Sequence, residues 1–209
     1  RAALPSGSPP RALFEHIRSP GDIHVTGSVG IFNMEGRRAL RHSPSTPLNY
    51  IYVGRLAPEK NLELLIREFH SNGRPLSIVG DGPQKELLKN MAKDNIRFLG
   101  HVPNDRLPEI YGRHDVFILP SRYEPWGLVV EEALFRGLPV IASDKVGSAA
   151  DMVAALETGA VFSLSAPDGL SNAIHEVEKN YETMARRVAD INWNSRVETQ
   201  LKAYTSLLD

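Results

Sequence analysis

The chain has 209 residues, of which 42% are hydrophobic and 23% charged, and its formal net charge is −1 at pH 7. This is the composition of an ordinary globular protein, and a nearly neutral chain has no overall field that would attract nucleic acid or an anionic membrane. The absence of cysteine excludes disulfides, thiolate catalysis and cysteine-ligated metals.

Residues 1–47 differ in composition from the rest of the chain. They hold six of the 15 prolines and show little apolar periodicity, although ALFEHI fits a short helix and DIHVTG a short strand. Such a segment is typical of a linker, or of the tail of a preceding domain. No run approaches the roughly 18 apolar residues of a membrane span, and no signal-peptide core is present, so we expect a cytoplasmic protein.

From residue 48 onward, apolar runs of strand length alternate with helical patterns. The runs are rich in β-branched and aromatic residues, which favour strands. They are LNYIYV (48–53), LSIV (76–79), IRFL (96–99), VFIL (116–119), PVIAS (139–143) and AVFSL (160–164).

The segments between these runs have the periodicity and the boundary residues of helices. Apolar residues at positions 62, 65, 66 and 69 form one stripe. Pro83 suits the first position of a helix over QKELLKNMA, and Asn104 suits the cap of DRLPEIYGRH. Gly137 suits the end of the helix that contains EEALFR.

Strands that alternate with helices imply right-handed crossovers and a parallel sheet with helices on both faces. We therefore expect residues 48–209 to form an α/β domain: a Rossmann-like, doubly wound parallel sheet of about six strands, with a closing C-terminal helix. In such sheets ligands bind beyond the carboxyl ends of the strands. The loops there are GRLAPEKN (54–61), GDGP (80–83), GHVPN (100–104), PSRYEPWG (120–127) and SDKVGSAA (143–150).

The first of these loops carries two cations. Gly54, at the end of the strand, allows a ligand to approach the backbone closely, and Arg55 and Lys60 suit a diphosphate. From this loop alone, a surface turn with solvated charges is an equal alternative.

The GDGP loop contains the first part of the dinucleotide fingerprint GxGxxG. Lys85 stands where the third glycine is required, and the loop follows the second strand of the alternation, not the first. A tight turn before a helix is therefore the better interpretation, and an NAD-binding domain is the weakest of the functional hypotheses.

The stretch SRYEPWGLVVEEALFRGLPVIAS (121–143) places Glu124 just before a Pro-Trp-Gly turn and Glu132 inside the following helix. Gly127 at the start of that helix leaves backbone N–H groups that attract an anion. Carboxylates accept hydrogen bonds from sugar hydroxyls, so a ligand with a sugar, a phosphate and a second sugar fits this order. The alternative is a solvated Glu124 and a Glu132 on the helix surface, where we also expect Glu131 to lie.

Other polar and aromatic positions have structural interpretations. Ser148 and Asp151 have the spacing of a capping box. His101 falls in a strand-end loop, where residue type alone favours a surface role. Asn192 caps a last amphipathic helix from about Trp193, a residue that we expect to anchor packing.

Taken in order, the segments VGRLAPEKN, IVGDGP, FLGHVP, LPSRYEPWGLVVEEA and GLPVIAS resemble one family. They are similar to the C-terminal, nucleotide-sugar-binding half of the group 1 (family 4) retaining glycosyltransferases, which have the GT-B fold. The resemblance covers roughly residues 48–208 and includes the closing segment NWNSRVETQLKAY.

The resemblance assigns roles to the acids and to the start of their helix. It implies that Glu124 contacts hydroxyls of the donor sugar and that Glu132 holds the ribose of the nucleotide. It also implies that backbone N–H groups around Gly127 and Leu128 bind the donor sugar and its phosphate.

The same resemblance makes Arg55 and Lys60 the basic pair that neutralises the diphosphate. It places Gly54 and Ser121 near the phosphates and the loop His101–Val102 near the base. Glu124 and the two cations would then be the residues that act in catalysis, because negative charge grows on the departing diphosphate.

The implied reaction uses a UDP-, GDP- or ADP-sugar as donor and no cofactor. The chain contains no Asp-x-Asp, so we expect no metal site and a metal-independent reaction. Retention without a protein nucleophile is consistent with front-side attack, in which the leaving phosphate helps to deprotonate the acceptor.

A complete GT-B enzyme has a second domain that holds the acceptor, here a glycan or a lipid-linked glycan. We expect residues 1–47 to be a linker or the tail of that domain, the chain alone to bind donor but transfer sugar poorly, and any peripheral contact with the cytoplasmic membrane face to depend on the missing part. Two alternatives stay open. One is a nucleotide-sugar 2-epimerase-like GT-B enzyme, and the other is a non-catalytic sugar-nucleotide-binding module.

Overall fold

The computed structural model describes residues 44–205 and, before them, residues 6, 7, 11, 15, 16, 23 and 26. The short helix and strand expected in ALFEHI and DIHVTG lie largely outside the described residues.

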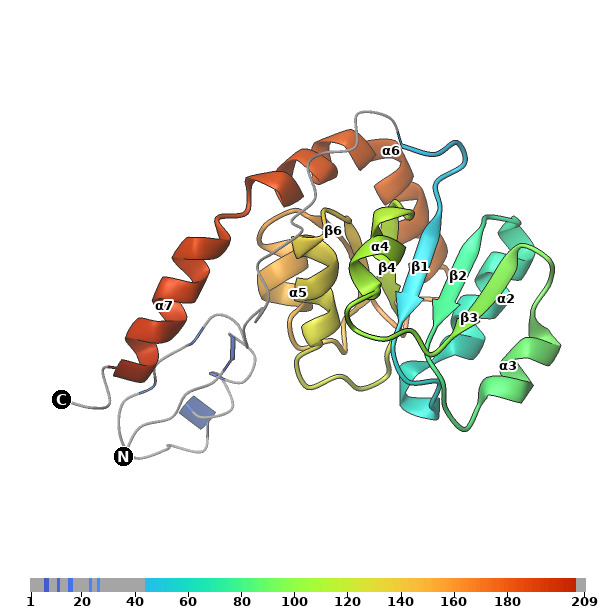
Figure 1. The fold of residues 1–209 in the computed structure, drawn as a ribbon, viewed down its shortest axis with the longest axis horizontal. Helices are drawn as coiled ribbons and strands as arrows, with labels where there is room; N and C mark the ends of the chain where they lie inside the picture. Colours follow the sequence, from blue (N-terminus) through green and yellow to red (C-terminus); the bar gives the residue numbers. More distant parts are fainter. Residues whose placement is uncertain are drawn as a thin grey trace.

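A six-stranded parallel sheet forms the centre of the molecule, with the strand order β3-β2-β1-β4-β5-β6 (Figure 1). Its strands are β1 (Tyr50–Val53), β2 (Leu76–Val79), β3 (Ile96–Gly100), β4 (Val116–Leu119), β5 (Val140–Ser143) and β6 (Gly159–Phe162). Each coincides with or overlaps one of the six apolar runs. The expected Rossmann-like, doubly wound fold is confirmed.

Three of the four inner strands are buried along their whole length. Every residue of β1, β4 and β5 is buried, as expected for a parallel sheet with both faces covered. This burial explains why the runs read as continuous apolar segments without alternation.

Helices and short helical turns connect and cover the strands (Figure 1). They are η1 (Pro58–Lys60), α2 (Leu62–Asn72), α3 (Lys85–Met91), α4 (Leu107–Gly112), α5 (Leu128–Phe135), the π-helix η2 (Ala149–Ala154), α6 (Gly169–Asp190) and α7 (Trp193–Thr205). The apolar stripe expected on α2 is confirmed, since all four of its members are buried.

Packing contacts show which helices share a face of the sheet. Tyr50 meets Phe69 of α2 edge to face, with ring centroids 5.1 Å apart, and its hydroxyl donates to Glu178 of α6. These two helices therefore share one face. His114, just after α4, contacts Ser77 of β2, which pairs with the residue that follows Tyr50 in β1. Successive residues of a strand point to opposite faces of the sheet, so α4 lies over the face opposite to α2 and α6.

Two expected helix starts differ from the structure. α3 begins two residues after Pro83, because the N–H of Gln84 donates to Leu56 O at 3.0 Å and ties the turn to the preceding loop. α4 begins at residue 107, and a backbone turn in which Arg106 N–H donates to Pro103 O precedes it, so Asn104 does not cap it.

Two expected helix boundaries are confirmed, the end of α5 and the start of α7. Gly137 follows α5 with φ +86°, a left-handed conformation that glycine adopts without strain. The N–H of Ser195 donates to Asn192 Oδ1 at 3.0 Å, which is the expected cap of α7. Trp193 is buried and meets Phe135 edge to face at 5.5 Å, so it anchors the helix as predicted.

The capping box predicted from Ser148 and Asp151 is wrong. Ser148 does precede η2, but no side-chain bond caps that turn, and the buried Ser148 hydroxyl has no hydrogen-bond partner among the described residues. In the part of the chain that the structure describes, no helix has both the length and the apolar content needed to cross a bilayer.

Candidate functional site

Two loops that are far apart in sequence meet at the carboxyl edge of the sheet. Lys60, at the end of η1, forms an ion pair with Glu124 in the β4–α5 loop. Asn61 donates from Nδ2 to Pro120 O at 3.2 Å, and Arg122 N–H donates to Glu59 O at 2.7 Å. The first cationic loop and the acidic loop thus form one surface.

The Lys60–Glu124 pair is largely shielded from water. The two side chains are 19% and 15% exposed. A lysine ammonium has three N–H donors, so the contact with Glu124 leaves donors for an anion at the same place. The pair is partly desolvated, so a charged ligand beside it interacts with it more strongly than with an ion pair that is fully exposed to water.

Arg55 lies on the same loop and is exposed. No carboxylate among the described residues forms an ion pair with it. Its carbonyl accepts a hydrogen bond from the Tyr52 hydroxyl at 2.9 Å. Burial, with the nearby carboxylates of Glu124 and Glu59, raises the pKa of Tyr52 well above its usual value, so this hydroxyl remains a donor.

Glycines in the adjoining loops are explained by close backbone contacts. A Cβ at Gly54 would lie 2.7 Å from the Tyr52 hydroxyl, and one at Gly80 would lie 1.9 Å from Gly54 O. A Cβ at Gly82 would lie 2.4 Å from Leu56 O. The spacing of the GDGP glycines thus follows from loop packing, which supports the tight-turn interpretation over a dinucleotide fingerprint.

The start of α5 lies beside Glu124. Its N-cap is Gly127, with φ +89° and no side-chain cap. A Cβ at Gly127 would be 3.2 Å from Glu124 Cγ. The next residue, Leu128, is 44% exposed. The amide end of the helix, the acid and the Lys60 ammonium are therefore neighbours, and a helix N-terminus favours negative charge.

A second loop shapes this turn. Glu124 forms a parallel bridge with Val146, and Gly147 N–H donates to Glu124 O at 2.9 Å. Ser148 N–H donates to Trp126 O, also at 2.9 Å. The loop after β5 thus holds the Pro-Trp-Gly turn in position.

Glu132 faces a different set of neighbours. Glu132 is an exposed residue, and the Tyr111 hydroxyl and the Arg136 guanidinium lie near its carboxyl group. Burial of the carboxyl raises the pKa of Glu132, and Arg136 opposes that shift. The structure therefore places Glu132 on the α4 side of α5, without a direct contact to the Lys60–Glu124 pair.

Glu131 does not lie on the helix surface, and the prediction for it is wrong. It is fully buried, and Trp126 Nε1 donates to its Oε1 at 2.5 Å. The indole N–H of a buried tryptophan needs an acceptor. The signal that could have revealed this role is the tryptophan five positions earlier in the same turn.

The remaining predicted positions lie in two strand-end loops. Ser121 is fully buried, its carbonyl accepts from Ser143 Oγ at 2.5 Å, and its own hydroxyl has no partner among the described residues. In the β3–α4 loop His101 is exposed and Val102 is half-buried against the core. Among the described residues, no three His, Asp or Glu side chains form a metal-binding cluster.

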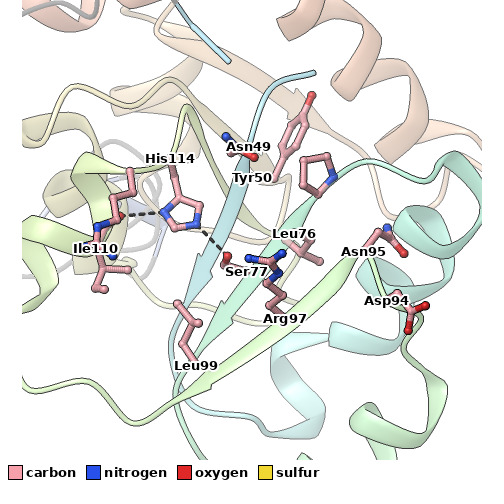
Figure 2. A pocket seen from close by; sticks show the side chains of 12 residues that line it. Asn49, Tyr50, Leu76, Ser77, Asp94, Asn95, Arg97, Leu99, Ile110 and His114 are labelled. Atoms are coloured by element: carbon pink, nitrogen blue, oxygen red, sulfur yellow. Dashed lines mark hydrogen bonds between the residues drawn. The ribbon is translucent and has the colours of Figure 1, made fainter. Parts of the chain in front are cut away.

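A hollow of about 430 Å³ lies at the opposite, amino edge of β1–β3 (Figure 2). His114 bridges its wall, with Nδ1 2.8 Å from Ile110 O and Nε2 2.8 Å from Ser77 Oγ. Asn95 Nδ2 donates to two backbone carbonyls. Because these lining groups are used in internal hydrogen bonds, this hollow is best explained as a structural feature of the sheet edge.

Comparison with known proteins connects the chain to one family. The family model for glycosyl transferases group 1 matches residues 37–191. A glycogen synthase of Mycobacterium tuberculosis is 30% identical over 185 residues, which cover 79% of this chain and 44% of the relative. A GDP-mannose-dependent alpha-mannosyltransferase of Mycolicibacterium smegmatis is 35% identical over 170 residues, with the same two coverages.

Solved structures show the same fold. The sucrose-phosphate synthase of Thermosynechococcus elongatus has a TM-score of 0.74 at 24% identity, covering 99% of this chain and 58% of that protein. TarM has a TM-score of 0.77 at 17% identity, with coverages of 99% and 43%. The chain spans less than half the length of the two curated relatives named above.

Proposed function

The chain belongs to the group 1 glycosyltransferase family, and on that premise we propose that it is the donor-binding domain of a retaining enzyme. The enzyme moves a sugar from a UDP-, GDP- or ADP-sugar to a glycan or lipid-linked acceptor. In this proposal residues 44–205 bind the donor, and by themselves they transfer sugar poorly because the acceptor is held elsewhere in the enzyme.

One observation carries this proposal: the contact between Lys60 and Glu124 beside Gly127 at the carboxyl edge of the sheet. It brings a cation, an acid and a helix N-terminus together where open parallel sheets bind ligands. These groups match a diphosphate linked to a sugar, since the ammonium and the helix amides suit the phosphates and the carboxylate suits hydroxyls.

The proposed chemistry uses charge stabilisation. The bond between the sugar C1 and the β-phosphate oxygen breaks, and its electron pair stays on the diphosphate. The acceptor hydroxyl forms the new bond to C1 on the same face, and its proton passes to a phosphate oxygen. Arg55, Lys60 and the first amides of α5 stabilise the charge that develops on the diphosphate, which requires no metal.

The other predicted residues hold the donor. Glu124 accepts hydrogen bonds from hydroxyls of the sugar, and Glu132 accepts them from the ribose. Ser121, at the start of the loop that carries Glu124, lies near the phosphates through its backbone, since its hydroxyl is buried. The loop His101–Val102 contacts the base.

Calorimetric titration with UDP, GDP and ADP tests the proposal. We expect the folded chain to bind one of them, and Arg55→Ala or Lys60→Ala to weaken that binding about tenfold, because each removes a charge-assisted contact to phosphate. Lys85→Ala is a matched control, since Lys85 pairs with Asp81 on a neighbouring loop. Binding of none of the three nucleotides by the folded chain would overturn the proposal.

A further inference from the structure

Glu131 of α5 is a carboxylate in an apolar region. It has no exposed surface, and its helix neighbours Val130 and Leu134 are also buried. Burying a carboxylate costs free energy unless hydrogen bonds or an opposite charge compensate. Trp126 Nε1 supplies a short hydrogen bond of 2.5 Å to Glu131 Oε1.

A positive charge of the C-terminal helix lies in the same region. Arg196 of α7 is half-buried, and its Nη2 lies 2.6 Å from Met152 Sδ in η2. Burial lowers the pKa of Arg196, whereas the carboxylates of Glu131 and Asp151 oppose that shift. Arg196 therefore contacts η2 directly, through Met152.

Trp126 connects this buried cluster to the proposed donor site. It stands between Glu124 and Gly127 and is only 7% exposed. Its ring also packs closely against Gly7, where a Cβ would lie 2.4 Å from Cζ3. A rotation of the indole would therefore displace the residues on both sides of it in the turn.

We propose that Glu131 is a positioning residue for the donor site: it holds the Trp126 indole and thereby the Glu124–Gly127 turn. The inference rests on the proposed function of that turn.

The contact itself is tested without any ligand. The chain has two tryptophans, so ¹⁵N-labelled protein gives two indole N–H signals, and Trp193→Phe assigns them. We expect the Trp126 signal to be downfield in the wild type and to move upfield in Glu131→Leu. A Trp126 signal that is unmoved in Glu131→Leu would overturn the inference.

The positioning role is tested by the affinity for the nucleoside diphosphate that the wild type binds best. Glu131→Leu should weaken it about tenfold, whereas Glu131→Gln, which keeps an acceptor, should weaken it less than about threefold. Trp126→Phe should match Glu131→Leu, and the double variant should be no weaker than either single change. Additive losses would contradict the inference. Glu182→Leu on the exposed side of α6 is the control.

Folding and function are kept apart in this design. If Glu131→Leu does not fold, Trp126→Phe carries the comparison of affinities, and Glu131→Gln, whose amide oxygen is a weaker acceptor than a carboxylate, carries the comparison of indole signals. If the wild type binds no nucleotide, the proposed function is wrong, and so is the positioning role of Glu131 in donor binding. The indole signals still decide whether Glu131 holds Trp126.

Discussion

Arg74 donates hydrogen bonds to both carboxylate oxygens of Glu178, which lies 104 positions further along the chain. Arg74 Nε lies 2.5 Å from Oε1 and Nη2 lies 2.6 Å from Oε2, and the Tyr50 hydroxyl donates to Oε1 at 3.0 Å. The two charged side chains are 19% and 26% exposed. This bidentate pair fastens α6 to the start of β1 and β2, on the face that also carries α2.

Glu178→Gln should lower the free energy of unfolding by about 2 kcal/mol, because it removes a charge-assisted, bidentate contact that is partly shielded from water. Urea denaturation at pH 7 measures the loss. Glu182→Gln on the same helix is the matched control, since its pair with Arg186 is largely exposed and should contribute little. An equal effect of both changes would contradict the assigned role of Glu178.

The same pair predicts how stability depends on pH. The hydrogen bonds from Arg74 hold the pKa of Glu178 below its ordinary value of 4.5. A depressed carboxyl pKa gives stability that is fully present above the unfolded value and is lost as pH falls through the folded value. The difference between wild type and Glu178→Gln should therefore be constant from about pH 7 to about pH 6 and shrink towards about pH 3. Parallel urea titrations check this, and a difference that persists in acid would contradict it.

The sheet and its ligand-binding edge could be predicted from the sequence because the signals are local. Each apolar run is short and contains β-branched residues, and most are bounded by Gly or Pro, so each predicts a strand. The Glu124 and Lys60 loops could be placed near each other because the carboxyl ends of parallel strands share one edge. Their direct ion pair could not be predicted, since it depends on the path of two loops held together through Asn61.

Where prediction failed, a tertiary contact overrode a local rule. Asn104 is a good capping residue, but the turn between Pro103 and Arg106 delays the helix. Glu131 looks like a surface residue until its partner Trp126 is placed. The long helix α6 is missing from the sequence-based expectations, although its buried Leu170, Ile174, Val177 and Tyr181 recur at helical spacing. Its contact through Glu178 with Arg74 joins residues far apart in the chain, so no local pattern could predict it.

Gly80 should tolerate no side chain. It has φ +132°, and a Cβ there would lie 1.9 Å from Gly54 O. Gly80→Ala should therefore lower the free energy of unfolding by about 3 kcal/mol or more, since backbone must move. Gly112→Ala in α4 is the control: nothing lies within 4 Å of its Cβ, and alanine favours the helix. Thermal denaturation should show a fall for the first and no fall for the second.

Donor affinity should depend on the ionisation of Glu132. Burial raises the pKa of this carboxyl above its ordinary value of 4.5, so it becomes protonated at a higher pH than an exposed glutamate. Only the ionised form accepts hydrogen bonds from two ribose hydroxyls. Affinity for the bound nucleotide should fall as pH is lowered towards that pKa, and the fall should be smaller in Glu132→Gln. Both proteins are titrated with the same nucleotide, so ionisation of its phosphates affects the two affinities equally and drops out of their ratio. Identical pH profiles of affinity would exclude a contact between Glu132 and the ribose.

Substitutions of Lys60 and Glu124 should show strong energetic coupling. Replacing either residue leaves the charge of the other unpaired, and the two side chains are only 19% and 15% exposed. Lys60→Met and Glu124→Gln should each lower the free energy of unfolding by about 2 kcal/mol, and the double variant should lose clearly less than the sum. Urea denaturation of the four proteins completes the cycle, and strictly additive losses would mean that the contact contributes nothing to stability. The double variant should bind nucleotide more weakly than the wild type even where its stability recovers, because it leaves no charge unpaired but has no cation there to neutralise a diphosphate. That separation between stability and binding distinguishes a ligand site from an ion pair that serves the fold alone.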